Sequence, residues 1–266
     1  MASRRSLQGA HPSTEVLTRG FDPRLSVGSA RPAVFRSSTY VFSSPEAAER
    51  AFALLTGKAE LEPGEQPDLI YSRFNHPNAE ILEDQIVPLE EGAAWAIVFN
   101  SGMAAIMTAL LALLKPGDAL VYTVPLYGGT QHLVHDLLEP LNIRCVPVIA
   151  GHSAEIDQAI RSTPGLKAVF IETPANPTMV MTDIKRAALA AASLDPKPAV
   201  IVDNTFLGPA FQHPVTLGAD VVVYSATKYL GGFSDLLAGV VLGVDPALDK
   251  PIRSRRGLFG NILQPD

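Results

Sequence analysis

A lysine stands at the end of one apolar segment of this chain. Lys228 follows the run DVVVYS at residues 220–225, and the hydroxyl groups of Ser225 and Thr227 beside it can donate to an oxyanion. A lysine among apolar neighbours is costly unless it is paired or covalently engaged. Partial desolvation also frees its amine as a nucleophile for Schiff-base chemistry. The alternative is a lysine whose stem is buried while its ammonium group reaches water.

A carboxylate ends a second apolar segment. Asp203 closes the run AVIVD at residues 199–203. A carboxylate in a dry site needs a cationic partner, and a protonated pyridine nitrogen can be that partner. Such a pair would hold a cofactor ring protonated, so that the ring acts as an electron sink. The alternative is an aspartate that caps the turn after its own strand.

Two other positions suggest where an anion and a planar ring would lie. Gly102 and Met103 follow Ser101 at a strand-to-helix junction, where free backbone N–H groups and a small residue suit a phosphate. Tyr127 precedes two glycines at another strand end, where its ring can stack on a planar cofactor. The alternatives are an ordinary helix cap with a turn glycine and a half-buried tyrosine.

Several familiar motifs are absent or incomplete. Ser225 and Lys228 have the S-x-x-K spacing of serine acyl-enzymes, but the accompanying SDN and KTG motifs are missing, so we reject that reading. The sequence contains no P-loop and no dinucleotide-binding glycine fingerprint after a strand. Its single cysteine, Cys145, excludes an internal disulfide and a CxxC site, and we expect no metal.

Short apolar runs alternate with helix-compatible segments along most of the chain, which is typical of βαβ units. We therefore predict a three-layer αβα fold of the α/β class with a mostly parallel seven-stranded sheet. The last two strands are close enough in sequence to be antiparallel, and the Pro- and Gly-rich connection before residue 220 holds no α-helix. Ligands of such sheets bind beyond the carboxyl ends of the strands, where the residues above converge. The predicted strands are residues 94–99, 119–124, 144–149, 167–173, 199–204, 220–225 and 238–243, and the predicted helices are 45–55, 103–114, 129–139, 154–162 and 182–193.

Composition narrows the class of protein. The 266 residues are 47% hydrophobic and 18% charged, with a formal net charge of −6, so a globular protein without affinity for nucleic acid or anionic membrane is expected. The early arginines are not followed by an apolar signal segment. Residues 92–114 carry no charge, but Asn100 to Gly102 divide them into a strand and a helix. We expect a cytoplasmic protein with no membrane partner.

Six motifs occur in an order and spacing that are specific in combination. They are Tyr71-Ser72-Arg73, Ser101-Gly102-Met103, Tyr127-Gly128-Gly129-Thr130, Glu172-Thr173-Pro174-Ala175-Asn176-Pro177, Asp203-Asn204-Thr205 and Ser225-Ala226-Thr227-Lys228-Tyr229. Together they resemble the Cys/Met-metabolism family of pyridoxal-phosphate enzymes, which includes cystathionine γ-lyase, cystathionine γ-synthase, methionine γ-lyase and O-acetylhomoserine sulfhydrylase. The resemblance runs from about Ser37 to the last residue.

The resemblance implies a role for each residue. Three are catalytic: Lys228 binds pyridoxal 5'-phosphate covalently and later shuttles protons, Asp203 pairs with the pyridine nitrogen, and Tyr127 stacks on the ring. Asn176 contacts the phenolic oxygen of the ring, and Thr205 belongs to the cofactor-binding set.

The resemblance also implies a phosphate site and an assembly. Tyr71 and Arg73 reach the phosphate of a neighbouring subunit, so a homodimer is the smallest competent unit and a tetramer, a dimer of dimers, is expected. An arginine suits a dianionic phosphate. Within one subunit, the phosphate lies against the backbone of Gly102 and Met103 and the hydroxyls of Ser225 and Thr227.

Some features depart from the family pattern. Gly129 stands where methionine γ-lyases typically carry a cysteine. We expect an N-terminal arm and helix over residues 1–60 and a cofactor-binding domain over 61–266, without the family's small C-terminal domain. That domain carries the arginine that binds the substrate's carboxylate; Arg253, Arg255 and Arg256 are expected instead on a solvated helical face.

The implied reaction is γ-elimination on sulfur-containing or O-acylated amino acids such as cystathionine or methionine. Replacement of the γ substituent by an incoming thiol, as in cystathionine γ-synthase or O-acetylhomoserine sulfhydrylase, is the alternative within the same family. A chain that binds cofactor or assembles with partners without turning over substrate is the alternative from another class.

Overall fold

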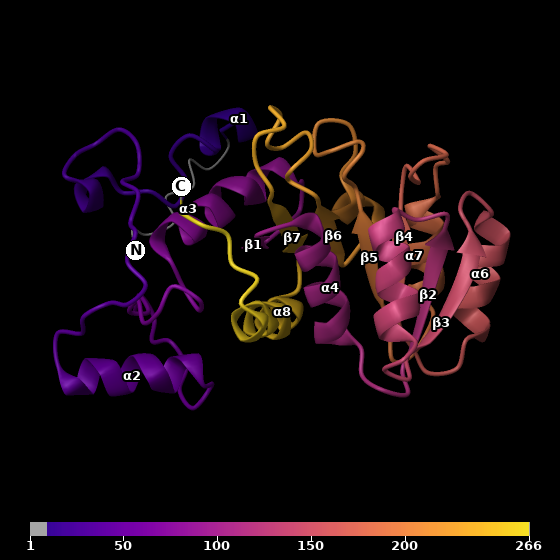
Figure 1. Ribbon diagram of the computed structural model, residues 1–266, viewed down its shortest axis with the longest axis horizontal. Coiled ribbons are helices and arrows are strands. Elements are labelled where there is room, and N and C mark those ends of the chain that lie inside the picture. The colour runs from indigo at the N-terminus through magenta and orange to yellow at the C-terminus, as the bar shows by residue number, and fades with distance from the viewer. Residues whose placement is uncertain (1–9, 266) are drawn as a thin grey trace. The chain divides into compact units, whose positions relative to one another are not determined.

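The computed structural model describes residues 10–265, which divide into two compact units. The first extends to Gln85 and includes the residues from Gln264, and the second runs from Ile86 to Leu263. The second unit contains the sheet, whose strands are labelled in Figure 1. Across residues 10–265, no helix is long and apolar enough to cross a membrane.

The second unit is built on one seven-stranded sheet in the order β1-β7-β6-β5-β4-β2-β3. Strand β7 runs antiparallel to both of its neighbours and the other described pairings are parallel. The predicted fold class, all seven strands and the antiparallel final pair are therefore confirmed. The strands are β1 Trp95–Phe99, β2 Ala119–Val124, β3 Arg144–Ile149, β4 Leu166–Glu172, β5 Ala199–Asp203, β6 Val221–Tyr224 and β7 Gly239–Gly243.

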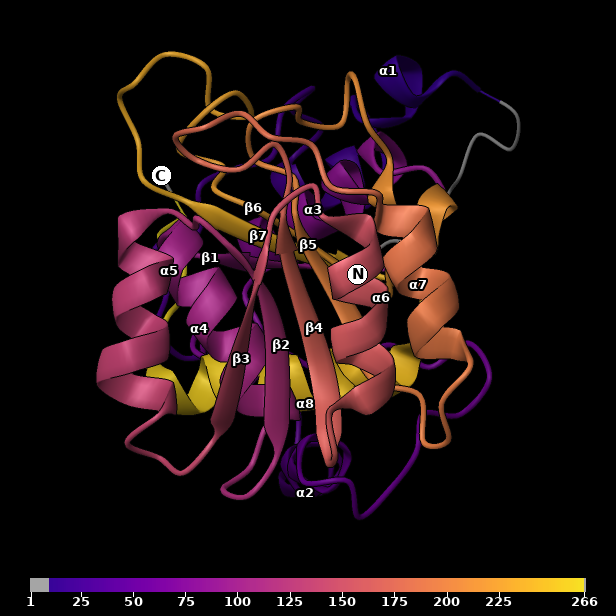
Figure 2. The ribbon, with the colours of Figure 1, turned by 90° about the vertical axis from the view of Figure 1, so that its right-hand side faces the viewer.

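Helices cover both faces of the sheet, as Figure 2 shows. Helix α4 packs on α8 and on β1, β6 and β7, whereas α6 and α7 pack on each other over the opposite face. A short 3-10 helix, Pro214–Leu217, is the regular element described between β5 and β6, which agrees with the predicted irregular connection. The helices are α4 Gly102–Leu113, α5 Gly128–His132 with a π-helical extension Leu133–Leu138, α6 Ser153–Ser162, α7 Ile184–Ala192 and α8 Pro246–Phe259.

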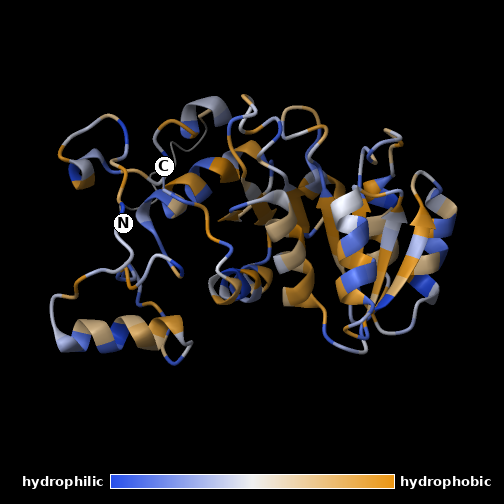
Figure 3. Cartoon of the chain, viewed as in Figure 1, coloured by the Kyte–Doolittle hydropathy of each residue, from blue (hydrophilic) through white to orange (hydrophobic). Residues whose placement is uncertain are grey.

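The core lies between the sheet and its helices because both contribute continuous apolar surface. Strands β1, β6 and β7 are buried along their whole length. Figure 3 shows the strands and α4 as the most hydrophobic elements of this unit. Strand β3 at the sheet edge is instead largely exposed and contains Pro147, which limits pairing with another strand. The hydrophobic core thus holds the carboxyl ends of the inner strands in fixed positions.

The arginines of α8 differ from the prediction of a solvated face. Arg256 is only 3% exposed and donates to the carbonyl oxygen of Val98 at 3.2 Å. Arg253 is partly buried and donates to the carbonyl oxygen of Ala96 at 3.0 Å. Both carbonyls belong to β1, which is an edge strand, so guanidinium groups satisfy acceptors that no neighbouring strand reaches. Of the three residues, Arg255 is exposed as predicted.

The first unit consists of short helices joined by extended segments. Its helix α2, Pro45–Leu55, confirms the predicted helix, and Arg50 of α2 forms a 2.6 Å ion pair with Glu65 of the following loop. Helix α3 was not predicted, because its polar and apolar residues give no clear periodicity. The other helices of this unit are α1 Pro12–Glu15, the 3-10 helix Pro23–Ser26 and α3 Pro77–Ile86. The 3-10 helix Val87–Leu89 follows α3 and belongs to the second unit.

A glycine of β7 permits a close approach to the start of α4. A Cβ atom on Gly239 would lie 2.1 Å from the carbonyl oxygen of Ser101, a contact that the backbone must move to relieve. We expect Gly239→Ala to lower the free energy of unfolding by about 1–3 kcal/mol, measured by denaturant titration. Gly128→Ala is the control, because a Cβ there meets nothing within 4 Å. Equal effects of the two substitutions would contradict this packing.

Candidate functional site

Residues that follow five different strands line one cavity of about 370 Å³ in the second unit. This volume lies within the usual range for small-molecule sites. Nine of the eleven predicted site residues line it, whereas Tyr71 and Arg73 belong to the first unit. The nine are Gly102, Met103, Tyr127, Asn176, Asp203, Thr205, Ser225, Thr227 and Lys228.

The start of α4 forms one end of this cavity. Ser101 caps the helix by accepting the N–H of Ala104 at 3.1 Å, and the first-turn N–H groups at Gly102 and Met103 have no acceptor within the helix. A Cβ on Gly102 would lie 2.7 Å from Cβ of Ser225, so only glycine allows this serine so near the helix end. Backbone donors and a hydroxyl therefore converge where an anion would bind.

Thr227 is engaged with the neighbouring backbone. Its hydroxyl donates to the carbonyl oxygen of Ala238 at 3.2 Å and accepts the N–H of the same residue at 3.0 Å. The hydroxyl must therefore turn before it can donate to a bound phosphate. These contacts also tie the start of the Lys228 loop to the segment that enters β7.

Asp203 is a buried carboxylate at the end of β5, with 7% exposure. Thr205 donates both its backbone N–H, at 3.0 Å, and its hydroxyl, at 2.6 Å, to Oδ1 of Asp203. Burial raises the pKa of this carboxyl, and the two Thr205 hydrogen bonds oppose that rise. Among residues 10–265 no cation pairs with Asp203, so the carboxylate still requires one.

A buried polar network holds the neighbouring strand ends. The Tyr224 hydroxyl donates to Oε2 of Glu90 at 2.7 Å, and Nδ2 of Asn204 donates to the Tyr224 oxygen at 2.9 Å. The Gln212 amide donates to Oδ1 of Asn204 at 2.8 Å. Burial raises the pKa of Glu90 and of Tyr224. This network fixes Asn204, and with it the turn that follows Asp203.

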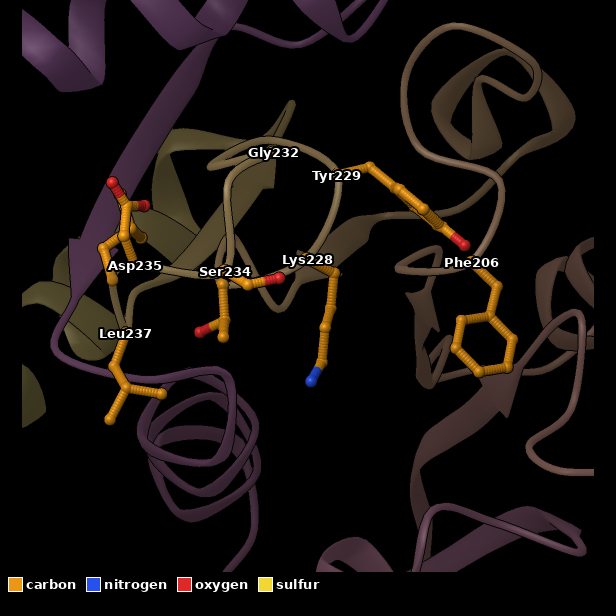
Figure 4. A pocket seen from close by; sticks show the side chains of 9 residues that line it. Phe206, Lys228, Tyr229, Gly232, Ser234, Asp235 and Leu237 are labelled. Carbon is orange, nitrogen blue, oxygen red and sulfur yellow. The ribbon is translucent and has the colours of Figure 1, made fainter.

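Lys228 lies in a turn beyond β6, and its side chain is exposed. The desolvation expected from the sequence is thus not provided by the described residues of this chain. Figure 4 shows its amine extending into open space between Leu237 and Phe206. These three residues and Thr227 line both the 370 Å³ cavity and an adjoining outer cavity of about 520 Å³. Lys228 therefore stands where the two cavities meet.

Glu172 is a site residue to which the sequence assigned no role. It ends β4, is 4% exposed and lines the inner cavity. Its carboxylate accepts the N–H of Tyr127 at 3.1 and 3.0 Å and the N–H of Asn176 at 2.7 Å. Burial, and secondarily the charge of Asp203, raises the pKa of Glu172 to about 7. The sequence does offer one indication that Glu172 belongs to the site, because it opens the Glu172–Pro177 motif at the end of a buried strand.

Apolar residues complete the cavity wall. Ile106 of α4 and Phe206 after β5 were not predicted, because only the folded chain shows which apolar side chains face the cavity. Pro174 and Leu237 lie in segments whose irregular backbone gives no periodic pattern to read.

The raised pKa of Glu172 predicts a pH dependence of stability in the cofactor-free protein. Because the folded state holds the proton up to about pH 7 and the unfolded state loses it near 4.5, stability falls as pH rises between these values. The proton bound by Glu172 contributes up to about 3 kcal/mol to the free energy of unfolding below about pH 4.5. Asp203 on β5 is the charged group that acts on this carboxyl, Lys228 lines the same cavity, and Tyr127 is its titratable neighbour on the adjoining loop.

Thermal melts of the wild type and Glu172→Gln at pH 5 and pH 7.5 measure this term. The wild type should lose stability over this interval more steeply than the variant. Parallel pH profiles of the two proteins would show that Glu172 does not take up a proton on folding.

These residues fit pyridoxal phosphate by their chemistry. The phosphate suits the donors at Gly102 and Ser225, and the unpaired Asp203 carboxylate suits a protonated ring nitrogen. Lys228 presents an amine at the opening of the same cavity for the aldehyde carbon. The inner cavity thus offers each chemical group of the cofactor a complementary partner.

Comparison with known proteins establishes the family. The chain belongs to the Cys/Met metabolism PLP-dependent enzyme family, whose model matches residues 13–266. The resemblance drawn from the motifs is confirmed, and the cofactor of this family is pyridoxal phosphate.

Curated relatives include both lyases and synthases. The chain is 35% identical over 254 residues to L-methionine gamma-lyase of Pseudomonas deceptionensis, covering 95% of this chain and 60% of that protein. It is 41% identical over 202 residues to cystathionine gamma-lyase of Bacillus subtilis, covering 76% and 52%. It is 36% identical over 239 residues to cystathionine gamma-synthase of Mycobacterium bovis, covering 90% and 56%. The chain thus spans between 52% and 60% of the length of these relatives.

Solved structures of the same family share the fold. The crystal structure of metB from Corynebacterium glutamicum matches with a TM-score of 0.83 at 30% identity, covering 97% of this chain and 61% of that one. The apo form of CalE6, a methionine gamma lyase from Micromonospora echinospora, matches with a TM-score of 0.81 at 32% identity, covering 97% and 64%.

Proposed function

We propose that this chain holds pyridoxal phosphate in the inner cavity and catalyses γ-elimination on sulfur-containing or O-acylated amino acids such as cystathionine or methionine. The observation that carries the proposal is the convergence of an amine, an unpaired buried carboxylate and a helix-start anion site on one 370 Å³ cavity. Independent strand ends supply these three groups, and together they complement the cofactor's aldehyde, ring nitrogen and phosphate.

Each residue of the site has its own part in the proposed reaction. Pyridoxal phosphate supplies an electron sink for a carbanion formed beside an amino nitrogen. In the proposal, Asp203 keeps a proton on the ring nitrogen, and Tyr127 covers one face of the ring. The amine of Lys228 would hold the cofactor through its aldehyde carbon and, when free, would move protons at the substrate's carbon atoms.

The outer cavity is the proposed place for substrate. It adjoins the inner cavity at Lys228 and is lined by apolar side chains, including those of Phe206, Tyr229 and Leu237. An apolar wall suits the methylene and thioether groups of a sulfur amino acid. The substrate's γ substituent would lie here, with its amine directed to the Lys228 side.

Replacement by a thiol is the alternative within the family, and Gly129 bears on the choice. A side chain at this position would lie 2.7 Å from Cε1 of Tyr127 and 3.0 Å from Sδ of Met103. The cysteine that methionine γ-lyases typically carry would therefore require the side chains of Tyr127 and Met103 to shift. This favours cystathionine over methionine as the substrate and leaves replacement as the second candidate.

The proposed assembly is a homodimer in which Tyr71 and Arg73 reach the phosphate of the neighbouring subunit, with a tetramer as the complete form. In the first unit, Arg73 lies 4.6 Å from the ring centroid of Phe74 and 5.4 Å from that of Tyr71. Stacking against aromatic rings holds a guanidinium in place for a phosphate. We further propose a cofactor-binding domain over residues 61–266 and a cytoplasmic location.

A direct assay separates the candidate reactions. Purified chain with pyridoxal phosphate is supplied with cystathionine, methionine or O-acetylhomoserine, and keto acid is measured with and without an added thiol. Elimination predicts keto acid from cystathionine without thiol, whereas replacement predicts a thioether product that needs the thiol. Cofactor binding without either product would support the non-catalytic binding or assembly subunit instead.

A further inference from the structure

Glu172 is a buried charged residue that the proposed reaction does not use. It ends β4 and pairs in register with Asp203 at the end of β5, so the cavity holds two neighbouring carboxyl groups. Its own N–H donates to Oγ1 of Thr123 on β2 at 3.1 Å, which ties the backbone of this residue to a second strand. Among the described residues, no cation pairs with Glu172. A buried carboxyl group without such a partner is costly and calls for a role.

The contacts of the carboxylate indicate that role. Both of its oxygens accept the N–H of Tyr127, in the loop after β2, and one also accepts the N–H of Asn176, in the loop after β4. No other side chain in the described residues accepts both of these N–H groups. One carboxylate thus sets the separation of two loops that leave different strands. The two residues it holds are both assigned to the ring in the proposed cofactor site, Tyr127 to one face and Asn176 to the phenolic oxygen.

We propose that Glu172 is a positioning residue that holds Tyr127 over one face of the cofactor ring and Asn176 beside its phenolic oxygen. This inference rests on the proposed function for the identity of the ring. A carboxylate suits the task because both of its oxygens are acceptors, so every orientation can receive the two N–H groups. A glutamine at this position has only one acceptor oxygen, and its NH2 group would point toward the N–H of Tyr127.

The structure ranks the substitutions of Glu172. Glu172→Gln retains an oxygen at the Oε1 position, which contacts both N–H groups, and should keep part of the anchor. Glu172→Asp retains the charge but shortens the side chain by one methylene, so its carboxylate falls short of Tyr127. Glu172→Ala removes the anchor. A role of charge alone predicts that aspartate is the best substitute, whereas positioning predicts that glutamine is.

The test combines hydrogen exchange with cofactor spectroscopy on the full chain at pH 8.5. In the cofactor-free protein, we expect the amides of Tyr127 and Asn176 to exchange about 10-fold faster in Glu172→Gln, and faster still in Glu172→Ala. The amide of Ala104, which is bound to Ser101, should be unchanged. Glu155→Gln on the exposed face of α6 is the control for loss of a carboxylate.

With pyridoxal phosphate added, each variant should still react through Lys228 and show a visible absorption band. We expect the visible circular dichroism of that band to decrease and the dissociation constant to rise about 10-fold in Glu172→Gln. Unchanged exchange, dichroism and affinity in all folded variants would overturn the inference. A wild type that shows no band would instead overturn the proposed function, and the exchange of the two amides would still report whether Glu172 anchors them.

Discussion

Replacing Lys228 with alanine is expected to reduce elimination of cystathionine by a factor of about 10³ or more. Lys228, whose amine Figure 4 shows, lines both cavities, and no other lysine among residues 10–265 lines either of them. Its loss removes both the covalent link to the cofactor and the base that moves protons. The rate of keto acid formation at saturating pyridoxal phosphate measures the effect.

The Lys228 substitution should act on chemistry and leave the fold intact. The side chain is exposed in this structure, so its truncation removes little packing and the melting temperature of the cofactor-free protein should stay within about 1–2 °C. Lys250→Ala on the exposed surface of α8 is the matched control and should retain activity. A Lys228→Ala protein with activity near that of the wild type would exclude this residue as the catalytic amine.

Replacing Asp203 with asparagine should have opposite effects on stability and on function. Burial raises the pKa of this carboxyl, so in the cofactor-free protein the charge destabilises the folded state at neutral pH, and its removal should raise the melting temperature. With cofactor present, the ring nitrogen loses its anionic partner. We expect turnover to fall about 100-fold and cofactor affinity to weaken.

Because stability should rise while turnover falls, the Asp203→Asn variant distinguishes a cofactor-binding role from a structural role. Thr205 can still donate to the amide oxygen of asparagine, so the local turn should persist. Asp136→Asn removes an exposed carboxylate that lines neither cavity, and it should alter neither stability nor turnover. A cofactor-free Asp203→Asn protein that is less stable than the wild type would show that Asp203 serves the fold rather than the cofactor.

Much of the second unit could be predicted because its strands other than β3 are largely buried. Runs such as AVIV, which precedes Asp203, and VVVY are apolar at every position, and this pattern is typical of covered strands. The residues after those strands then follow from topology, since parallel strands bring their carboxyl ends to one edge. This topology explains why Asp203, Ser225 and Tyr127 line one cavity.

The environments of Arg256, Lys228 and Glu172 could not be predicted, because they depend on contacts between segments that the sequence pattern does not reveal. Arg256 looked like a surface residue because helix charges usually face water, yet an edge strand supplied carbonyl acceptors in the core. Lys228 looked desolvated because of its apolar neighbours in sequence, but the chain turns there and exposes it. The role of Glu172 depends on hydrogen bonds from Tyr127 and Asn176, which are 45 and 4 residues away in sequence. The sequence alone does not show that these two N–H groups share one carboxylate.

The most direct test of the central claim is to locate the bound cofactor on the chain. The purified protein is mixed with pyridoxal phosphate, the visible absorption band is recorded, and borohydride reduction is followed by peptide mass spectrometry. The account predicts a saturable band and a phosphopyridoxyl group on Lys228, with neither in Lys228→Ala. Absence of the band, or modification spread over surface lysines at equal levels in both proteins, would contradict it.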